Sequence, residues 1–211
     1  VNDSGQTAAD AAVLLCKKEG DASVLCFYKT IDNVIKRIDT FSEGCWINVV
    51  SPTPEEIAYL TEELSLDRSF VSAALDEEES SRVEVEDDQT LIIIDTPIAV
   101  TEADNTLVYT TMPLGIIVTK SSVVTICLNQ ITAVEDVAQG VVRNVQTAMK
   151  TRFLLMLLLR VAQSFLFRLK HINKLTSQME SELHRSMQNK KLVQMTGLQK
   201  SLVYFSSSLK A

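Results

Sequence analysis

Glycine, proline, cysteine and histidine are all scarce in this sequence of 211 residues. Its six glycines and four prolines exclude long linkers and low-complexity tracts. The four cysteines (Cys16, Cys26, Cys45 and Cys127) form no C-x-x-C pair. This pattern is typical of buried free thiols in a reducing compartment, and it argues against a disulfide framework or a zinc site. We therefore expect an intracellular chain with a packed core, since its hydrophobic content of 46% is ordinary for a globular protein.

Long apolar runs are also missing. The most hydrophobic segment, residues 153–159, is followed directly by Arg160, whereas a bilayer span needs about 20 predominantly apolar residues. The apolar stretch 8–16 lacks the basic segment that opens a signal peptide. We expect the chain as given to be soluble, with residues 153–159 on the buried face of a helix.

Signatures of catalysis are weak. The two histidines, His171 and His184, lie thirteen residues apart without H-E-x-x-H spacing, which favours solvent-facing positions on a basic helix. Cys45 opens an apparent strand with no histidine nearby, so we expect a buried core cysteine there. Neither of the two common glycine-rich phosphate motifs is present. The sequence therefore predicts a protein that is not an enzyme.

The net charge of −7 conceals two parts of opposite sign. Residues 150–211 contain eleven Lys and Arg against two Glu, a balance of +9, whereas residues 1–149 have a balance of −16. This asymmetry indicates either two partners or an assembly in which each part faces the other. The basic part could suggest nucleic-acid binding. We expect no nucleic-acid partner, because the acidic part would repel phosphate.

Alternation and apolar runs predict a series of strands in the first two thirds of the chain. The expected strands are residues 24–28, 34–38, 45–50, 82–86, 91–94 (a central strand), 107–109, 114–119 and 123–128. A helix should begin at Thr53 and run to about Leu64, because Thr53, Pro54 and Glu56 suit the cap, the first position and the capping box. Asp67 is a second possible cap, for a short helix.

After the last predicted strand the apolar period becomes helical. An amphipathic helix is expected over residues 133–149, and two coiled-coil-like seams follow, with Asn189 as the break and cap between them. The predicted fold class is α/β (α+β): a mixed β-sheet sandwiched by helices in residues 1–149, then a long antiparallel helical hairpin in residues 150–211. The second seam continues to the last residues and the chain does not begin with methionine. We therefore expect a fragment of a longer protein.

The densest charge cluster consists of Asp76, Glu77, Glu78 and Glu79, with more acidic residues at positions 84–88. Mg²⁺ and Ca²⁺ bind carboxylate oxygens, often with several waters retained, so these four residues are candidate metal ligands. The alternative is a solvated loop beside a charged strand edge that discourages edge-to-edge pairing. The residues alone favour the solvated loop, because acidic loops commonly bind nothing.

Three stretches are distinctive: residues 45–56 (CWINVVSPTPEE), residues 82–94 (Arg-Val-Glu before the run Leu-Ile-Ile-Ile) and residues 198–205 (LQKSLVYF). The first resembles the W-I-N-V-x-x-P-T-x-E-E opening of the cytosolic domain in CorA-type divalent-cation channels. The second resembles the strand pair that follows in that family, and the third is similar to a helix of one bacterial branch. Their order and spacing cover nearly the whole chain.

The resemblance implies the cytosolic regulatory domain of a homopentameric Mg²⁺ channel, on the cytoplasmic side of the membrane. The stalk, the membrane spans and the Gly-Met-Asn signature of the family are not in this sequence. In the family, acidic residues at protomer interfaces bind regulatory Mg²⁺ and hold the closed state. At the positions where the family has one acidic pair, this sequence has Ser72 and Ala73. Asp76 and Glu77 are displaced from these positions toward the following loop. The resemblance thus implies either a site moved to residues 76–79 or a different mode of sensing.

Two other interpretations remain. A relative with the same fold could transport Zn²⁺ or another divalent ion, because the pore decides the ion. Alternatively, the chain is a standalone α/β scaffold whose basic hairpin binds an acidic partner or nucleic acid. Without membrane spans, we expect the fragment itself to be a monomer or a dimer.

Overall fold

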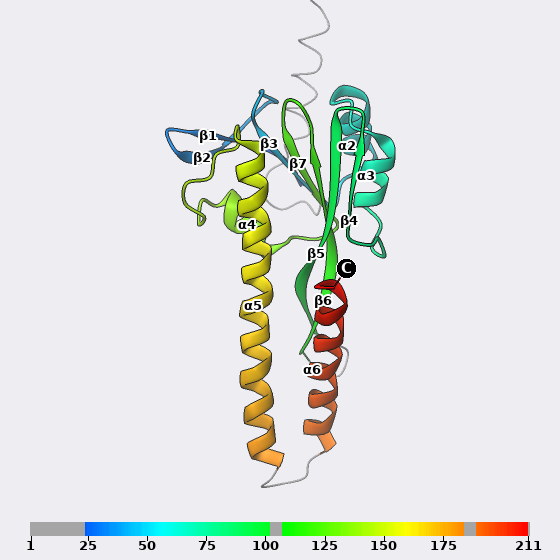
Figure 1. Ribbon diagram of the computed structural model, residues 1–211, viewed down its shortest axis with the longest axis vertical. Coiled ribbons are helices and arrows are strands. Elements are labelled where there is room, and N and C mark those ends of the chain that lie inside the picture. Colours follow the sequence, from blue (N-terminus) through cyan, green and yellow to red (C-terminus); the bar gives the residue numbers. More distant parts are fainter. Residues whose placement is uncertain (1–23, 102–106, 184–188, 211) are drawn as a thin grey trace, which may run out of the picture. The chain divides into compact units, whose positions relative to one another are not determined.

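The computed structural model describes residues 24–101, 107–183 and 189–210 (Figure 1). Its strands are β1 (Val24–Ile31), β2 (Val34–Ile38), β3 (Trp46–Val50), β4 (Arg82–Glu86), β5 (Gln89–Thr101), β6 (Leu107–Val118) and β7 (Val123–Cys127). In the described residues these seven strands form one sheet in the order β2-β1-β3-β7-β6-β5-β4. β3 and β7 run parallel, whereas β1–β2, β1–β3, β4–β5 and β6–β7 are antiparallel. The sheet is mixed, which confirms the predicted α/β class.

In the described residues, helices lie between the strands and after them along the chain. They are α2 (Pro54–Ala58), the π-helix η1 (Tyr59–Glu63), α3 (Arg68–Ala74), α4 (Thr132–Ala138), α5 (Lys150–Leu183) and α6 (Asn189–Ser208). The described residues form two compact units: the first lies within residues 24–94 and 113–158, the second within residues 95–112 and 159–210. The predicted boundary between two domains at residue 150 stays a prediction. A division into compact units does not show which part of the chain folds by itself.

Two local signals in the sequence determine the start of the first unit. Asp32 and Asn33 both have positive φ (54° and 62°), and two such residues make the tight turn whose twist matches a β-hairpin. At the start of α2, Glu56 N donates to Thr53 Oγ1 (3.3 Å) and Thr53 N donates to Glu56 Oε2 (2.8 Å). The predicted capping box is confirmed, and the predicted helix to Leu64 exists as α2 followed by η1.

The first unit has three layers, with α2, η1 and α3 on one face of the sheet and α4 and the start of α5 on the other (Figure 1). Side chains alternate along β3. Ile47 belongs to the core that includes Leu60 and Phe70, whereas Trp46 points the other way and contacts Phe153 of α5, with ring centroids 5.2 Å apart. Both faces of this sheet are therefore covered.

The helix predicted over residues 133–149 is wrong beyond residue 138. α4 ends at Ala138, because Gly140 adopts a left-handed conformation (φ 72°). Gly140 N donates to Val137 O (3.1 Å) and Val141 N donates to Asp136 O (2.9 Å). These two hydrogen bonds form a Schellman motif, which closes a helix.

The strands predicted at residues 107–109 and 114–119 are one strand, β6, which continues through Pro113. Proline has no N–H to donate to a neighbouring strand. The register of β6 with β7 runs from Gly115 to Val118, so Pro113 lies outside that paired stretch. The run 91–94 belongs to β5, which has a neighbouring strand on each side, β6 and the edge strand β4.

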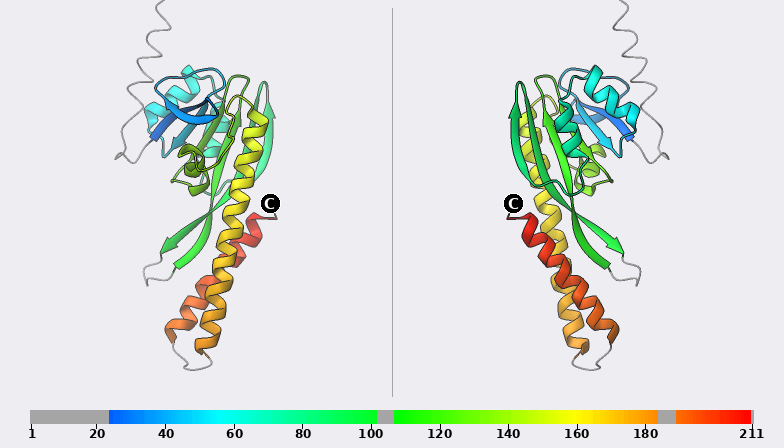
Figure 2. Two further views of the ribbon diagram at one scale, coloured as in Figure 1. Left: turned by 90° about the vertical axis from the view of Figure 1, so that its left-hand side faces the viewer. Right: turned by 90° about the vertical axis from the view of Figure 1, so that its right-hand side faces the viewer.

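In the second unit, α5 and α6 form the predicted antiparallel hairpin, and the ends of β5 and β6 form a two-stranded ribbon (Figure 2). Phe165 of α5 meets Phe205 of α6 edge to face, with centroids 5.0 Å apart. Ser201 Oγ accepts a hydrogen bond from Tyr109 N (2.8 Å). α6 begins at Asn189, where the break is predicted, although the side chain of Asn189 lies outside the description. No helix in the described ranges is long and apolar enough to cross a membrane.

Candidate functional site

The four predicted metal ligands lie in the loop that joins α3 to β4. α3 begins at Asp67, whose Oδ1 accepts from Ser69 N (2.7 Å) and Phe70 N (3.2 Å). A further hydrogen bond, donated by the Ser69 hydroxyl, contributes most to the lowered pKa of the Asp67 carboxyl. Phe70 and Ala74 are buried and hold the helix on the sheet. The acidic loop, residues 76–79, thus begins one residue after a firmly packed helix.

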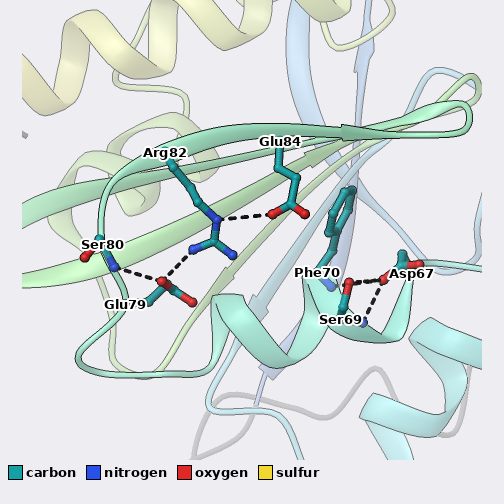
Figure 3. A network of polar contacts seen from close by, with 7 residues as sticks. All are labelled: Asp67, Ser69, Phe70, Glu79, Ser80, Arg82 and Glu84. Carbon is teal, nitrogen blue, oxygen red and sulfur yellow. Dashed lines mark hydrogen bonds and ion pairs between the residues drawn. The ribbon is translucent and has the colours of Figure 1, made fainter.

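Within the acidic loop, the carboxylates have different partners. Asp76 Oδ1 accepts from Glu78 N (2.9 Å), which closes the loop locally. Glu79 Oε1 accepts from Ser80 N (3.0 Å) and lies 2.5 Å from Arg82 Nη1 (Figure 3). Glu77 and Glu78 are exposed to solvent. Glu79 is therefore engaged by a cation of the protein itself, whereas Glu77 and Glu78 face water.

Arg82 is the residue that the sequence pattern did not identify as part of this site. Its Nε donates to Glu84 Oε2 (3.1 Å), so the guanidinium bridges the acidic loop and β4 (Figure 3). The carboxylate of Glu84, followed by that of Glu79, raises the pKa of Arg82. The three-residue spacing of Glu79 and Arg82 is the signal that could have revealed the pair. A divalent cation would have to compete with Arg82 for Glu79.

A pocket of about 540 Å³ adjoins the acidic loop. It lies between the α2–η1 segment and α3, and its lining is Ile57, Thr61, Arg68, Val71, Ser72, Leu75, Asp76 and Glu77. Asp76 and Glu77 thus come together at one opening, beside the exposed Ser72. Mg²⁺ is often bound through one or two carboxylates while it keeps several waters. Two carboxylates are enough for binding of that kind.

In the part of the chain that the structure describes, the acidic loop included, no group of three His, Cys, Asp or Glu comes together that could hold a metal ion. His171 is exposed, as predicted, and its Nδ1 lies 2.6 Å from Tyr109 Oη. Cys45 is buried, as predicted, together with Cys26 and Cys127. His184 and Cys16 lie outside the described residues.

Residues 41–211 match the model of a family described as CorA-like Mg²⁺ transporter protein. The cobalt/magnesium transport protein CorA of Methanocaldococcus jannaschii is 29% identical over 173 residues, which are 78% of this chain and 51% of that protein. The chain therefore spans about half the length of this curated relative.

Solved structures of relatives have the same fold. The complete magnesium transporter CorA of Methanocaldococcus jannaschii superposes with a TM-score of 0.73 at 26% identity, over 89% of this chain and 59% of that one. The soluble domain of the same protein gives 0.75 at 25% identity, over 88% and 74%. The cytoplasmic domain of ZntB from Vibrio parahaemolyticus shares the fold alone, with 12% identity, a TM-score of 0.61, and coverage of 86% and 72%.

Proposed function

The chain belongs to the family of CorA-like Mg²⁺ transporter proteins, and we propose that it is the cytosolic regulatory part of a divalent-cation transporter, without enzymatic activity. The family match over residues 41–211 is the observation that supports this proposal most strongly, because it includes strands β3 to β7, the acidic loop and the helical hairpin. In this proposal the transported ion is Mg²⁺, and Mg²⁺ is also the regulatory ligand.

The acidic loop is the proposed sensor. Asp76 and Glu77 line one pocket and repel each other when both are ionised, and a bound Mg²⁺ offsets that repulsion. Glu78 is exposed beside them and can join through a retained water, whereas Glu79 mainly shapes the loop through Arg82. In the assembled transporter, which we propose to be a pentamer, a neighbouring copy adds further oxygen ligands. Cation binding then favours the closed assembly over the open one.

A related transporter for another divalent ion is the second candidate. The shared fold with the cytoplasmic domain of ZntB supports it, because one fold can serve transporters of different ions. A standalone scaffold with a basic hairpin is the third candidate. The exposed lysines Lys170 and Lys174 of α5 fit an acidic partner in that case.

The first experiment reads the gene beyond codon 211. Two hydrophobic spans with Gly-Met-Asn support the transporter, whereas an immediate stop codon favours the scaffold. The whole gene product is then reconstituted in liposomes, and the uptake of Mg²⁺, Co²⁺ and Zn²⁺ is measured. Mg²⁺ on the side of the regulatory part should inhibit uptake.

Two double variants test the sensor in the same assay. Asp76→Asn/Glu77→Gln should need roughly tenfold more Mg²⁺ for inhibition, because it removes both charges from the pocket while keeping the shape. Glu86→Gln/Asp87→Asn is the matched control, since it makes the same charge change at the β4–β5 turn. Equal inhibition of both variants would refute the acidic loop as the sensor.

A further inference from the structure

A second pocket of the first unit lies on the opposite face of the sheet from the acidic loop. Its volume is about 380 Å³, within the range of sites for small organic ligands. α4 and the loop before it form one wall, and β1, β2 and β3 form the other. The apolar part of the lining comes from Val50, Ile131, Val134 and Ala138.

Asn48 of β3 presents a hydrogen-bond donor to this pocket. The residue as a whole is only 7% exposed. Trp46 Nε1 donates to Thr125 Oγ1 (2.8 Å), so this hydroxyl accepts there and has one hydrogen left to donate. That hydrogen goes to Asn48 Oδ1 (2.9 Å), because the alternative acceptor, Ile47 O, is farther away (3.4 Å). Asn48 Nδ2 consequently has no hydrogen-bond partner in the described chain, and it lines the pocket.

Glu135 of α4 presents a carboxylate, a hydrogen-bond acceptor, to the same pocket. It lies one helical turn after Ile131 and one turn before Ala138, so it shares their pocket-facing side of the helix. The carboxylate is half-buried and forms no ion pair within the described residues. Arg37 also lines the pocket and adds positive charge on the β2 side. A hydrogen-bond donor, a carboxylate, an arginine and an apolar wall therefore surround one cavity.

These features select a ligand class. A metal ion alone would leave the Asn48 amide unused, because N–H groups do not bind cations. A simple carboxylate would leave Glu135 without a cationic partner. We propose that the pocket binds a small aliphatic zwitterion of the class of apolar α-amino acids. Its ammonium group donates to Glu135, its carboxylate accepts from Asn48 Nδ2, and its side chain packs on Val50 and Val134. This proposal does not rest on the proposed function.

Calorimetric titration of the 211-residue chain with L-leucine, in buffer containing EDTA, tests the proposal. Leucine should bind with a Kd of about 1 mM or below. 3-Methylbutanoate, which lacks the ammonium group, and 3-methylbutylamine, which lacks the carboxylate, should each bind at least about tenfold more weakly. The absence of binding at 10-fold higher leucine, roughly 10 mM, would overturn the proposal. So would equal binding of either analogue.

Two variants locate the site. Glu135→Gln keeps the shape of the side chain and should weaken leucine binding at least about tenfold. Glu63→Gln makes the same change at an exposed position of η1, away from this pocket, and should leave binding unchanged. Asn48→Asp keeps the acceptor for Thr125 and replaces the donor by a second carboxylate oxygen, so it should also weaken binding. Leucine binding that survives Glu135→Gln unchanged would show that it occurs elsewhere.

Discussion

The contact between Gly115 and Ala74 fixes α3, and thereby the acidic loop, on the sheet. A Cβ added at Gly115 of β6 would lie 2.3 Å from Ala74 Cβ and 3.0 Å from Ala74 Cα. Neither atom belongs to a flexible side chain, so the backbone of α3 or β6 has to move. Overpacking of this kind typically costs 1–3 kcal/mol, and we expect Gly115→Ala to lower the free energy of unfolding by about 3 kcal/mol.

A double-mutant cycle isolates that contact. Ala74→Gly alone should cost about 1 to 2 kcal/mol, through helix propensity and the lost methyl group. In the double variant the clash of the two Cβ atoms is gone, so the combined loss should be about 2 to 3 kcal/mol and clearly below the sum of the single losses. Urea unfolding followed by fluorescence measures all three, since Trp46 is the one tryptophan and is fully buried. Additive losses would refute the proposed close contact.

Two further predictions concern capping and pH. Thr53→Ala should lower the free energy of unfolding by about 1 kcal/mol, whereas Thr53→Ser, which keeps the hydroxyl, should be nearly neutral in urea unfolding. Burial, and secondarily the Glu135 carboxylate, raises the pKa of Cys127 from 9.0 to about 12. Because the unfolded thiol ionises at lower pH, stability should fall as pH rises from about 9 toward 12. Cys127→Ala should make the fall in the free energy of unfolding between pH 8.5 and 9.5 less steep. An unchanged slope would show that ionisation of Cys127 does not cause this fall.

The sequence predicted the elements that depend on local chemistry. Thr53, Pro54 and Glu56 start α2 because their groups satisfy one another within a single turn. The prediction failed where a single residue outweighs the apolar pattern. Gly140 ends α4 in the middle of a continuous helical period. At Pro113 the opposite holds, since the strand continues through a residue that usually interrupts pairing.

The site was only partly predictable. The position of the acidic loop follows from the cap at Asp67 and the length of α3. β4 begins at Arg82, as predicted, and the three-residue spacing of Glu79 and Arg82 is a local signal of their pairing that the prediction did not use. The pocket formed by Asn48 and Glu135 joins residues far apart in sequence and on different elements. These two residues are neighbours because β3, which contains Asn48, pairs with β7. α4, which contains Glu135, follows β7 directly along the chain.

The central claim is that Asp76 and Glu77 bind Mg²⁺, and thermal unfolding of this chain tests it most directly. Mg²⁺ at one hundred times its Kd stabilises the folded chain by about 2.7 kcal/mol, which corresponds to a rise in Tm of about 5 to 10 °C at this size. NaCl of equal ionic strength is the reference. We predict that the wild type and Glu86→Gln/Asp87→Asn show this rise, and that Asp76→Asn/Glu77→Gln does not. No rise in the wild type, or an equal rise in all three, would contradict the account.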